Sequence, residues 1–237
     1  MEINIIFIGL VLLIIIFVVK NFVLIRDLRV SKKYNKLYRA VADKDPDIIN
    51  KIEEYIKNEK NEYLINKANV LLMYQKLLNG EDVSNIVSKI DYTKIFFVKN
   101  KYDKDHVNLN SDMFIWTICC LPRLRKGDIL PLIKDKVSEV KDNLSKHIEC
   151  KVFFAACAVL ERNTEESKFL DKLVNGEYSN LEYDKHIIAV TKRVALAYIA
   201  SLNREKNIEY ADELKILSET SLGKNLLTDL GIYEVYK

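Results

Sequence analysis

The stretch EYLINKANVLLMYQKLLNG, residues 62–80, shows the helical pattern on which the fold prediction rests. Its apolar residues recur at spacings of three and four, which places them along one face of an α-helix. They are Leu64, Ala68, Leu71, Leu72 and Leu78. Asn79-Gly80 supplies the stop, because glycine readily adopts the left-handed conformation that ends many helices. We therefore predict an amphipathic helix that ends at this dipeptide.

Outward from this helix, long and short helical segments alternate. The short segment EDVSNIVSKI (81–90) follows directly, with Asp82 as a candidate N-cap. The same arrangement recurs later in the chain as 147–163 followed by 164–176, and as 186–204 followed by 207–219. Between them, NSDMFIWTICCL ends at Pro122, and a helix restarts after Gly127 with Asp128 as its cap. Upstream, residues 31–43 and 45–58 make a first pair.

The long segments can be overlaid at a period of about 42 residues, starting from Lys67, Leu109, Lys151 and Arg193. Two sets of positions then fall in register, namely Leu71, Met113, Ala155 and Ala197, and Tyr74, Trp116, Ala158 and Ala200. Helix-turn-helix units of this kind cannot bury their apolar faces alone, so stacking creates their shared core. We predict an all-α fold in which such units stack as a solenoid.

Two of these units resemble tetratricopeptide-type repeats. The resemblance rests on small-large helix pairing at Ala68, Leu71 and Tyr74, and at Ala195, Tyr198, Leu202, Ala211 and Leu214. The chain departs from that family in lacking its Trp-Leu-Gly-Tyr signature and in having a longer period. The resemblance implies an α-helical repeat with a surface that binds peptides or helices, and it implies no catalytic residues.

The first 25 residues predict a single transmembrane helix. From Ile3 to Val19 only Asn4 and Gly9 are not Ile, Leu, Val or Phe, and apolar residues resume up to Ile25. As a helix the run extends about 25–34 Å, which brackets the hydrocarbon core of a bilayer. A cleaved leader lacks support because no A-x-A-like site follows the run, and a buried soluble helix would need a very large host. We predict an anchor over 1–25 and a helical-repeat domain over 26–237.

The basic residues around the predicted span set its direction. All of them follow it, and none precedes it: Lys20, Arg26, Arg29, Lys32, Lys33, Lys36 and Arg39. Because positive flanks remain on the cytoplasmic side, we expect a single-pass membrane protein with its N-terminus outside and its C-terminal domain in the cytoplasm. The four cysteines have no regular disulfide framework, which agrees with reduced, buried thiols.

Two groups of residues are candidates for contact with a partner. Tyr74, Trp116 and Tyr198 are expected either in the core or along a concave peptide-binding groove. Arg123, Arg125 and Lys126 form the densest basic loop, between two prolines. Such a loop can meet anionic lipid or an acidic partner, or it can be a solvated turn.

From the sequence we predict that the protein is not an enzyme and binds no cofactor. His147, Cys150 and Cys157 could be imagined around zinc, but paired Cys-x-x-Cys spacing is missing. The segment from Asp103 to Asp112 departs from a calcium loop at its glycine position, and phosphate-loop, nucleophile-elbow and His-Glu-x-x-His motifs are missing too. A formal net charge of only +3 argues against nucleic acid as a partner. No small-molecule substrate is expected.

The sequence therefore predicts a membrane-anchored cytoplasmic scaffold that binds protein partners through a helical-repeat surface. The alternative is a small integral subunit of a larger membrane complex, whose span packs against other helices. The span has Gly9 alone and no small-xxx-small seam, which favours a plain tether.

Overall fold

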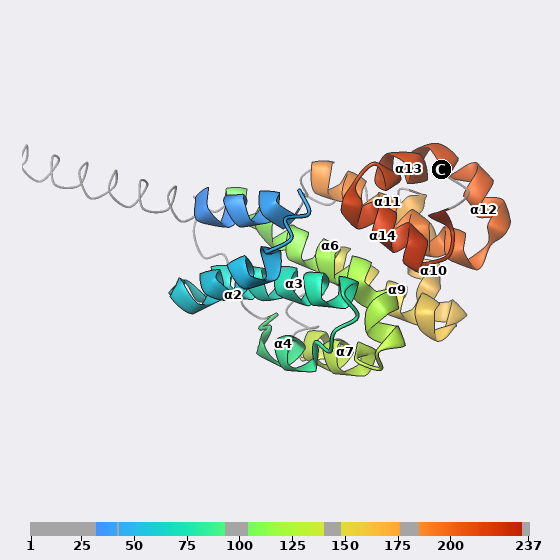
Figure 1. Cartoon of the computed structure of the whole chain (residues 1–237). Helices are drawn as coiled ribbons and strands as arrows, with labels where there is room; N and C mark the ends of the chain where they lie inside the picture. The colour runs from blue at the N-terminus through green and yellow to red at the C-terminus, as the bar shows by residue number, and fades with distance from the viewer. Residues whose placement is uncertain (1–31, 42, 93–103, 140–147, 176–184, 234–237) are drawn as a thin grey trace, which may run out of the picture. The chain divides into compact units, whose positions relative to one another are not determined.

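The protein is helical throughout the part of the chain that can be described. The computed structural model describes residues 32–41, 43–92, 104–139, 148–175 and 185–233 (Figure 1). Within these ranges the structure has α-helices and no β-strand, which confirms the all-α prediction. None of the helices in the same ranges has both the length and the apolar character that crossing a bilayer requires. The predicted anchor, residues 1–25, lies outside the described residues.

The chain divides into two compact units, Met1–Lys51 and Ile52–Lys237. In the first unit, a helix covers residues 32–41 and buries Tyr34 and Leu37. The division falls inside α2, Ile48–Asn58. The predicted boundary between residues 25 and 26 lies outside the described residues. The second unit holds all the elements discussed below.

Long helices followed by short ones recur along the second unit as the sequence predicts, but after α11 three short helices stand where one segment, 207–219, is predicted. The long ones are α3 (Glu62–Leu78), α6 (Lys104–Lys126), α9 (Ile148–Glu161) and α11 (Lys185–Leu202). The shorter ones are α4 (Ser84–Lys89), α7 (Leu130–Ser138), α10 (Thr164–Val174), α12 (Arg204–Glu209), α13 (Ala211–Ser218) and α14 (Ser221–Asp229). Each long helix is thus followed by at least one shorter helix.

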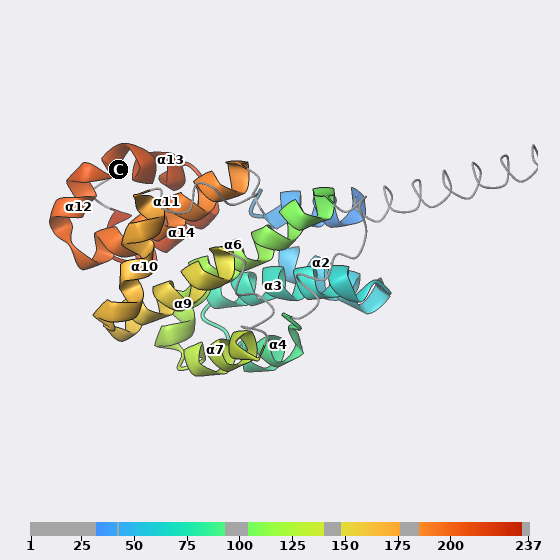
Figure 2. The same ribbon diagram turned by 180° about the vertical axis from the view of Figure 1, so that it is seen from behind.

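The long helices pack in chain order, and α6 lies at the centre of the second unit. Helix α3 packs on α6, α6 packs on α9, and α9 packs on α11 (Figures 1 and 2). Helix α6 also contacts α11 and α14, so it touches both the beginning and the end of the unit. Among the short helices, α4 packs on α7 and α7 on α9.

The positions that the 42-residue overlay aligns are all buried. Leu71, Met113, Ala155 and Ala197 are at most 2% exposed, and Tyr74, Trp116, Ala158 and Ala200 at most 7%. The rings of Tyr74 and Trp116 meet edge to face, with their centroids 4.7 Å apart. The overlay therefore identifies the face that each long helix turns toward the core.

Helix α6 does not end at Pro122, which corrects the sequence prediction. It continues through Pro122 to Lys126. Proline has no N–H, so the carbonyl of Ile118, one turn earlier, loses its usual helical donor. The buried hydroxyl of Tyr198, on α11, donates a 2.6 Å hydrogen bond to that carbonyl. A side chain from a neighbouring helix thus replaces the missing N–H, and the proline is tolerated inside the helix.

This substitution of one donor for another gives a testable prediction. Tyr198→Phe should lower the free energy of unfolding by about 1–2 kcal/mol, because it leaves the buried Ile118 carbonyl without that donor. Pro122→Ala restores an N–H in the helix, so Tyr198→Phe should cost much less in that background. Denaturant midpoints of the unchanged protein, the two single variants and the double variant give the coupling free energy between Tyr198 and Pro122. Equal costs in both backgrounds would contradict the assignment.

Buried tyrosines predict unfolding in alkali. Burial raises the pKa of Tyr74 from its ordinary value to about 12, and burial also raises the pKa of Tyr92 and Tyr198. In the unfolded chain these phenols ionise near pH 10, while in the folded protein they stay neutral to higher pH. Stability should therefore be intact below about pH 10 and fall as the pH rises above it.

The measurement is a joint titration by phenolate absorbance and circular dichroism. We expect a late group of tyrosines to ionise only as helical signal is lost. If all the tyrosines ionised together near pH 10 with the helices intact, the three phenols would not be protected as described.

Candidate functional site

A cleft of ≈ 730 Å³, here called the terminal cleft, lies where α3, α6 and α14 end. Helix α3 and the turn after it contribute one wall, the end of α6 and the turn after it another, and α14 a single residue. The lining residues are Leu77, Gly80, Glu81, Asp82, Arg123, Lys126, Gly127, Ile129 and Asp229. The site thus combines segments that are far apart in the sequence.

The three helices end here through the same backbone motif. After each last turn, one residue takes the left-handed conformation: Gly80 after α3 (φ 73°), Asp128 after α6 (φ 56°) and Gly231 after α14 (φ 76°). In each case the following N–H reaches back to a carbonyl of the last turn, as with Glu81 to Lys76 at 2.9 Å. Asp128 therefore ends α6, which corrects its prediction as the N-cap of the next helix. Helix α7 begins at Leu130 without a side-chain cap.

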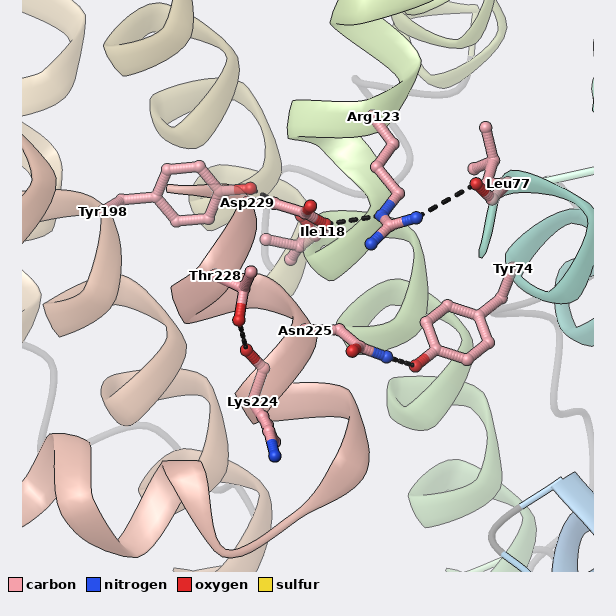
Figure 3. A network of polar contacts seen from close by, with 9 residues as sticks. All are labelled: Tyr74, Leu77, Ile118, Arg123, Tyr198, Lys224, Asn225, Thr228 and Asp229. Carbon is pink, nitrogen blue, oxygen red and sulfur yellow. Dashed lines mark hydrogen bonds and ion pairs between the residues drawn. The ribbon is translucent and has the colours of Figure 1, made fainter. Parts of the chain in front are cut away.

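Arg123 joins the three helix ends. From the last turn of α6, its Nε donates to Oδ2 of Asp229 on α14 at 2.6 Å, and its Nη1 donates to the carbonyl of Leu77 on α3 at 3.1 Å (Figure 3). The C-terminal end of a helix carries partial negative charge, and three such ends meet here. A guanidinium is suited to this place because it presents several fixed donors and stays charged.

A second polar contact attaches α14 to α3. Asn225 donates a 2.6 Å hydrogen bond from Nδ2 to the hydroxyl of Tyr74 (Figure 3). Tyr74 is only 5% exposed and also packs on Trp116. Helix α14 is therefore held by one amide and one carboxylate, Asn225 and Asp229, which lie one turn apart on the same helix face.

The rim of the terminal cleft carries both signs of charge. Glu81 lies 3.5 Å from the ammonium of Lys76 and accepts a hydrogen bond from Asn79. Asp82 accepts from the hydroxyl and the N–H of Ser84 at 2.7 and 3.0 Å, and these hydrogen bonds lower its pKa. Asp82 thus lies one residue before Val83, the N-cap of α4, which corrects its prediction as that cap. Lys126 is exposed and makes no ion pair with the described part of the chain.

The predicted aromatic residues belong to the core. Tyr74 is 5% exposed, Trp116 7% and Tyr198 0%, so these rings do not line an open groove. Of the two predicted positions, the core or a peptide-binding groove, their burial supports the core. The hydroxyl of Tyr74 accepts a hydrogen bond from Asn225 of α14, and the hydroxyl of Tyr198 donates one to the Ile118 carbonyl of α6.

The predicted basic loop is the last turn of α6, which corrects the sequence prediction. Arg123, Arg125 and Lys126 all lie inside the helix. Arg123 is partly buried in its contacts with α3 and α14, whereas Arg125 and Lys126 are exposed. Arg123 and Lys126 line the terminal cleft, and Arg125 does not.

Sequence reasoning missed the acidic side of the cleft. Asp82 stood out only as a helix cap, and nothing near Asp229 indicates its pairing with a residue far upstream. The Asn79-Gly80 stop was the one signal for the turn that carries Glu81 and Asp82.

The four cysteines are buried thiols. Cys119, Cys120, Cys150 and Cys157 are at most 4% exposed, and burial raises the pKa of Cys119 and Cys120. Within the described ranges, no group of three histidine, cysteine or acidic side chains could hold a metal ion. His147 lies outside the described residues.

Comparison of the chain with models of protein families, with curated proteins and with solved structures gives no match.

Proposed function

We propose that this chain is a membrane-anchored scaffold that binds a protein partner at the terminal cleft, with its helical domain in the cytoplasm. The observation that supports binding is the cleft itself, where charged side chains surround ≈ 730 Å³ between three helix ends. Pockets that take small molecules have volumes of about 300–1,000 Å³, so the cleft has room for side chains of a bound peptide. Leu77 and Ile129 supply apolar wall beside the charged rim.

The anchoring part of the proposal rests on the sequence. The apolar run over residues 3–25 has the length of a bilayer span, and the basic residues follow it. A tether of this kind holds the helical domain at the membrane surface. The function is then to place a bound partner there.

We also propose that the long and short helices form repeat units of the tetratricopeptide type in the broad sense. Support comes from the alternation of helix lengths and from the burial of all eight overlaid positions. Stacked units of this type expose helix ends along one edge, and the terminal cleft lies at such ends.

Site-specific photo-crosslinking in cells tests the binding site. A photoreactive residue replaces Lys126, which is exposed and lines the cleft, or Lys215, which is exposed on α13 away from it. We expect a discrete adduct with a partner from position 126 and none from position 215. Adducts of equal yield from both positions, or none from position 126, would refute the proposal.

Removal of residues 1–25 separates the scaffold from an integral subunit. If the chain is a scaffold, the truncated protein is no longer found in the membrane fraction but still forms the crosslinked adduct at position 126. A partner that is lost together with the span would support the integral-subunit alternative. A reporter that is active only in the cytoplasm, fused after Lys237, checks the direction of the span.

A further inference from the structure

We propose that the terminal cleft binds a basic side chain, lysine or arginine, of the partner segment. This inference rests on the proposed function and specifies the chemistry of the bound segment. The charged lining consists of three carboxylates, Glu81, Asp82 and Asp229, and two cations, Arg123 and Lys126. Lys76, outside the lining, pairs with Glu81 at 3.5 Å, so the side-chain charges balance.

The negative potential of the cleft comes from the backbone. Helices α3, α6 and α14 all end at the cleft, and each C-terminal end carries roughly half a negative charge. Arg123 is directed at two of these ends and is already engaged there, through Leu77 O and Asp229. The remaining field favours a further cation over an anion.

Asp229 points to where that cation would bind. Its side chain is only 9% exposed, and its Oδ2 is taken by Arg123 (Figure 3). Its other oxygen, Oδ1, accepts no hydrogen bond from the described residues, although a carboxylate has room for several. A nearly buried carboxylate with one oxygen unused, in the wall of a cleft, is a site for an added donor.

The shape of the cleft suits a long side chain with a charged tip. Glycines at positions 80 and 127 leave two wall positions without side chains, and a Cβ at Gly80 would meet no atom within 4 Å. Lysine and arginine can lay their methylene stems on apolar atoms while the charged group reaches a carboxylate. Leu77 and Ile129 offer those atoms. A small metal ion has no methylene stem to place on these apolar atoms, so the lining suits a lysine or arginine side chain better.

The test measures peptide binding to the full-length chain in nonionic detergent. The probes are short capped peptides that carry a neutral dye and alternate leucine with lysine, with glutamate or with glutamine. We expect the lysine peptide to bind, the glutamine peptide to bind more weakly, and the glutamate peptide to bind least. Binding of the lysine peptide should weaken as salt is added.

Three variants locate the binding. Asp82→Asn keeps an acceptor for Ser84 and removes one charge, and it should weaken the lysine peptide about fivefold. Lys126→Gln removes a competing cation and should strengthen the same peptide about threefold. Asp212→Asn, on the exposed face of α13, is the matched control and should change nothing.

The outcomes distinguish this inference from the proposed function. Preference for the glutamate peptide, or binding of the lysine peptide that ignores both Asp82→Asn and Lys126→Gln, would overturn the basic-group assignment. So would no binding of any of the three peptides. The crosslink at position 126 would still stand in each case, because it does not depend on the charge of the partner.

Discussion

Gly223→Ala should lower the free energy of unfolding by about 3 kcal/mol, through a clash that the fold has no room to relieve. Gly223 lies in the first turn of α14, which passes close to the end of α13. A Cβ at this position would overlap the carbonyl oxygen of Leu217 and lie 2.7 Å from its Cγ. The Gly223 N–H donates to Oγ1 of Thr220 at 3.0 Å, which fixes the turn in place.

Because the obstructing atom is backbone, α14 has to shift or detach. Either change pulls Asn225 and Asp229 away from α3 and α6. Gly127→Ala is the matched control, since a Cβ there meets its nearest atom at an ordinary 3.6 Å. It should cost less than about 0.5 kcal/mol. Denaturant midpoints by circular dichroism decide, and equal costs for the two alanines would show that α14 does not dock as closely as described.

Arg123→Ala should cost about 2–4 kcal/mol. Its partner Asp229 has a side chain only 9% exposed, so removing the guanidinium leaves a carboxylate that is neither solvated nor paired. The substitution also removes the donor to the Leu77 carbonyl, 46 residues away in the sequence. Arg123 is itself about one-quarter exposed, at 26%, which keeps the expected cost below that of a fully buried pair.

Two comparisons make this prediction specific. Arg125→Ala removes the same kind of side chain two residues along an exposed face of α6, and it should cost within about 0.5 kcal/mol. The double variant Arg123→Ala, Asp229→Asn removes the stranded charge, so it should be more stable than Arg123→Ala alone. Additive losses would mean that the two side chains are not coupled.

The helices could be predicted from the sequence because their apolar spacing is local information. The apolar stripe through Leu64, Ala68 and Leu71 predicts α3, and Asn79-Gly80 predicts its end. The end of α6 could not be predicted, since Pro122 ordinarily stops a helix. The hydroxyl that compensates for it comes from Tyr198, 80 residues after the Ile118 carbonyl to which it donates. Local rules therefore fail where a tertiary contact replaces a local one.

Only the basic residues of the candidate site stand out in the sequence. The sequence shows a basic cluster of Arg123, Arg125 and Lys126, but their different roles depend on neighbours that are distant in the chain. Asp229 lies 106 residues from Arg123, and nothing in its local sequence marks that pairing. Only the packing of α14 against α6 distinguishes Arg123, which is partly buried, from the exposed Arg125 and Lys126.

The late position of α14 in the chain also orders events during translation. Ribosomes make α3 and α6 first, and the contacts Tyr74–Asn225 and Arg123–Asp229 span 151 and 106 residues. A nascent chain can therefore fold most of its helices while the wall at Asp229 is still missing. Docking of α14 then completes both contacts, so the second unit reaches its final packing only after α14 has been made.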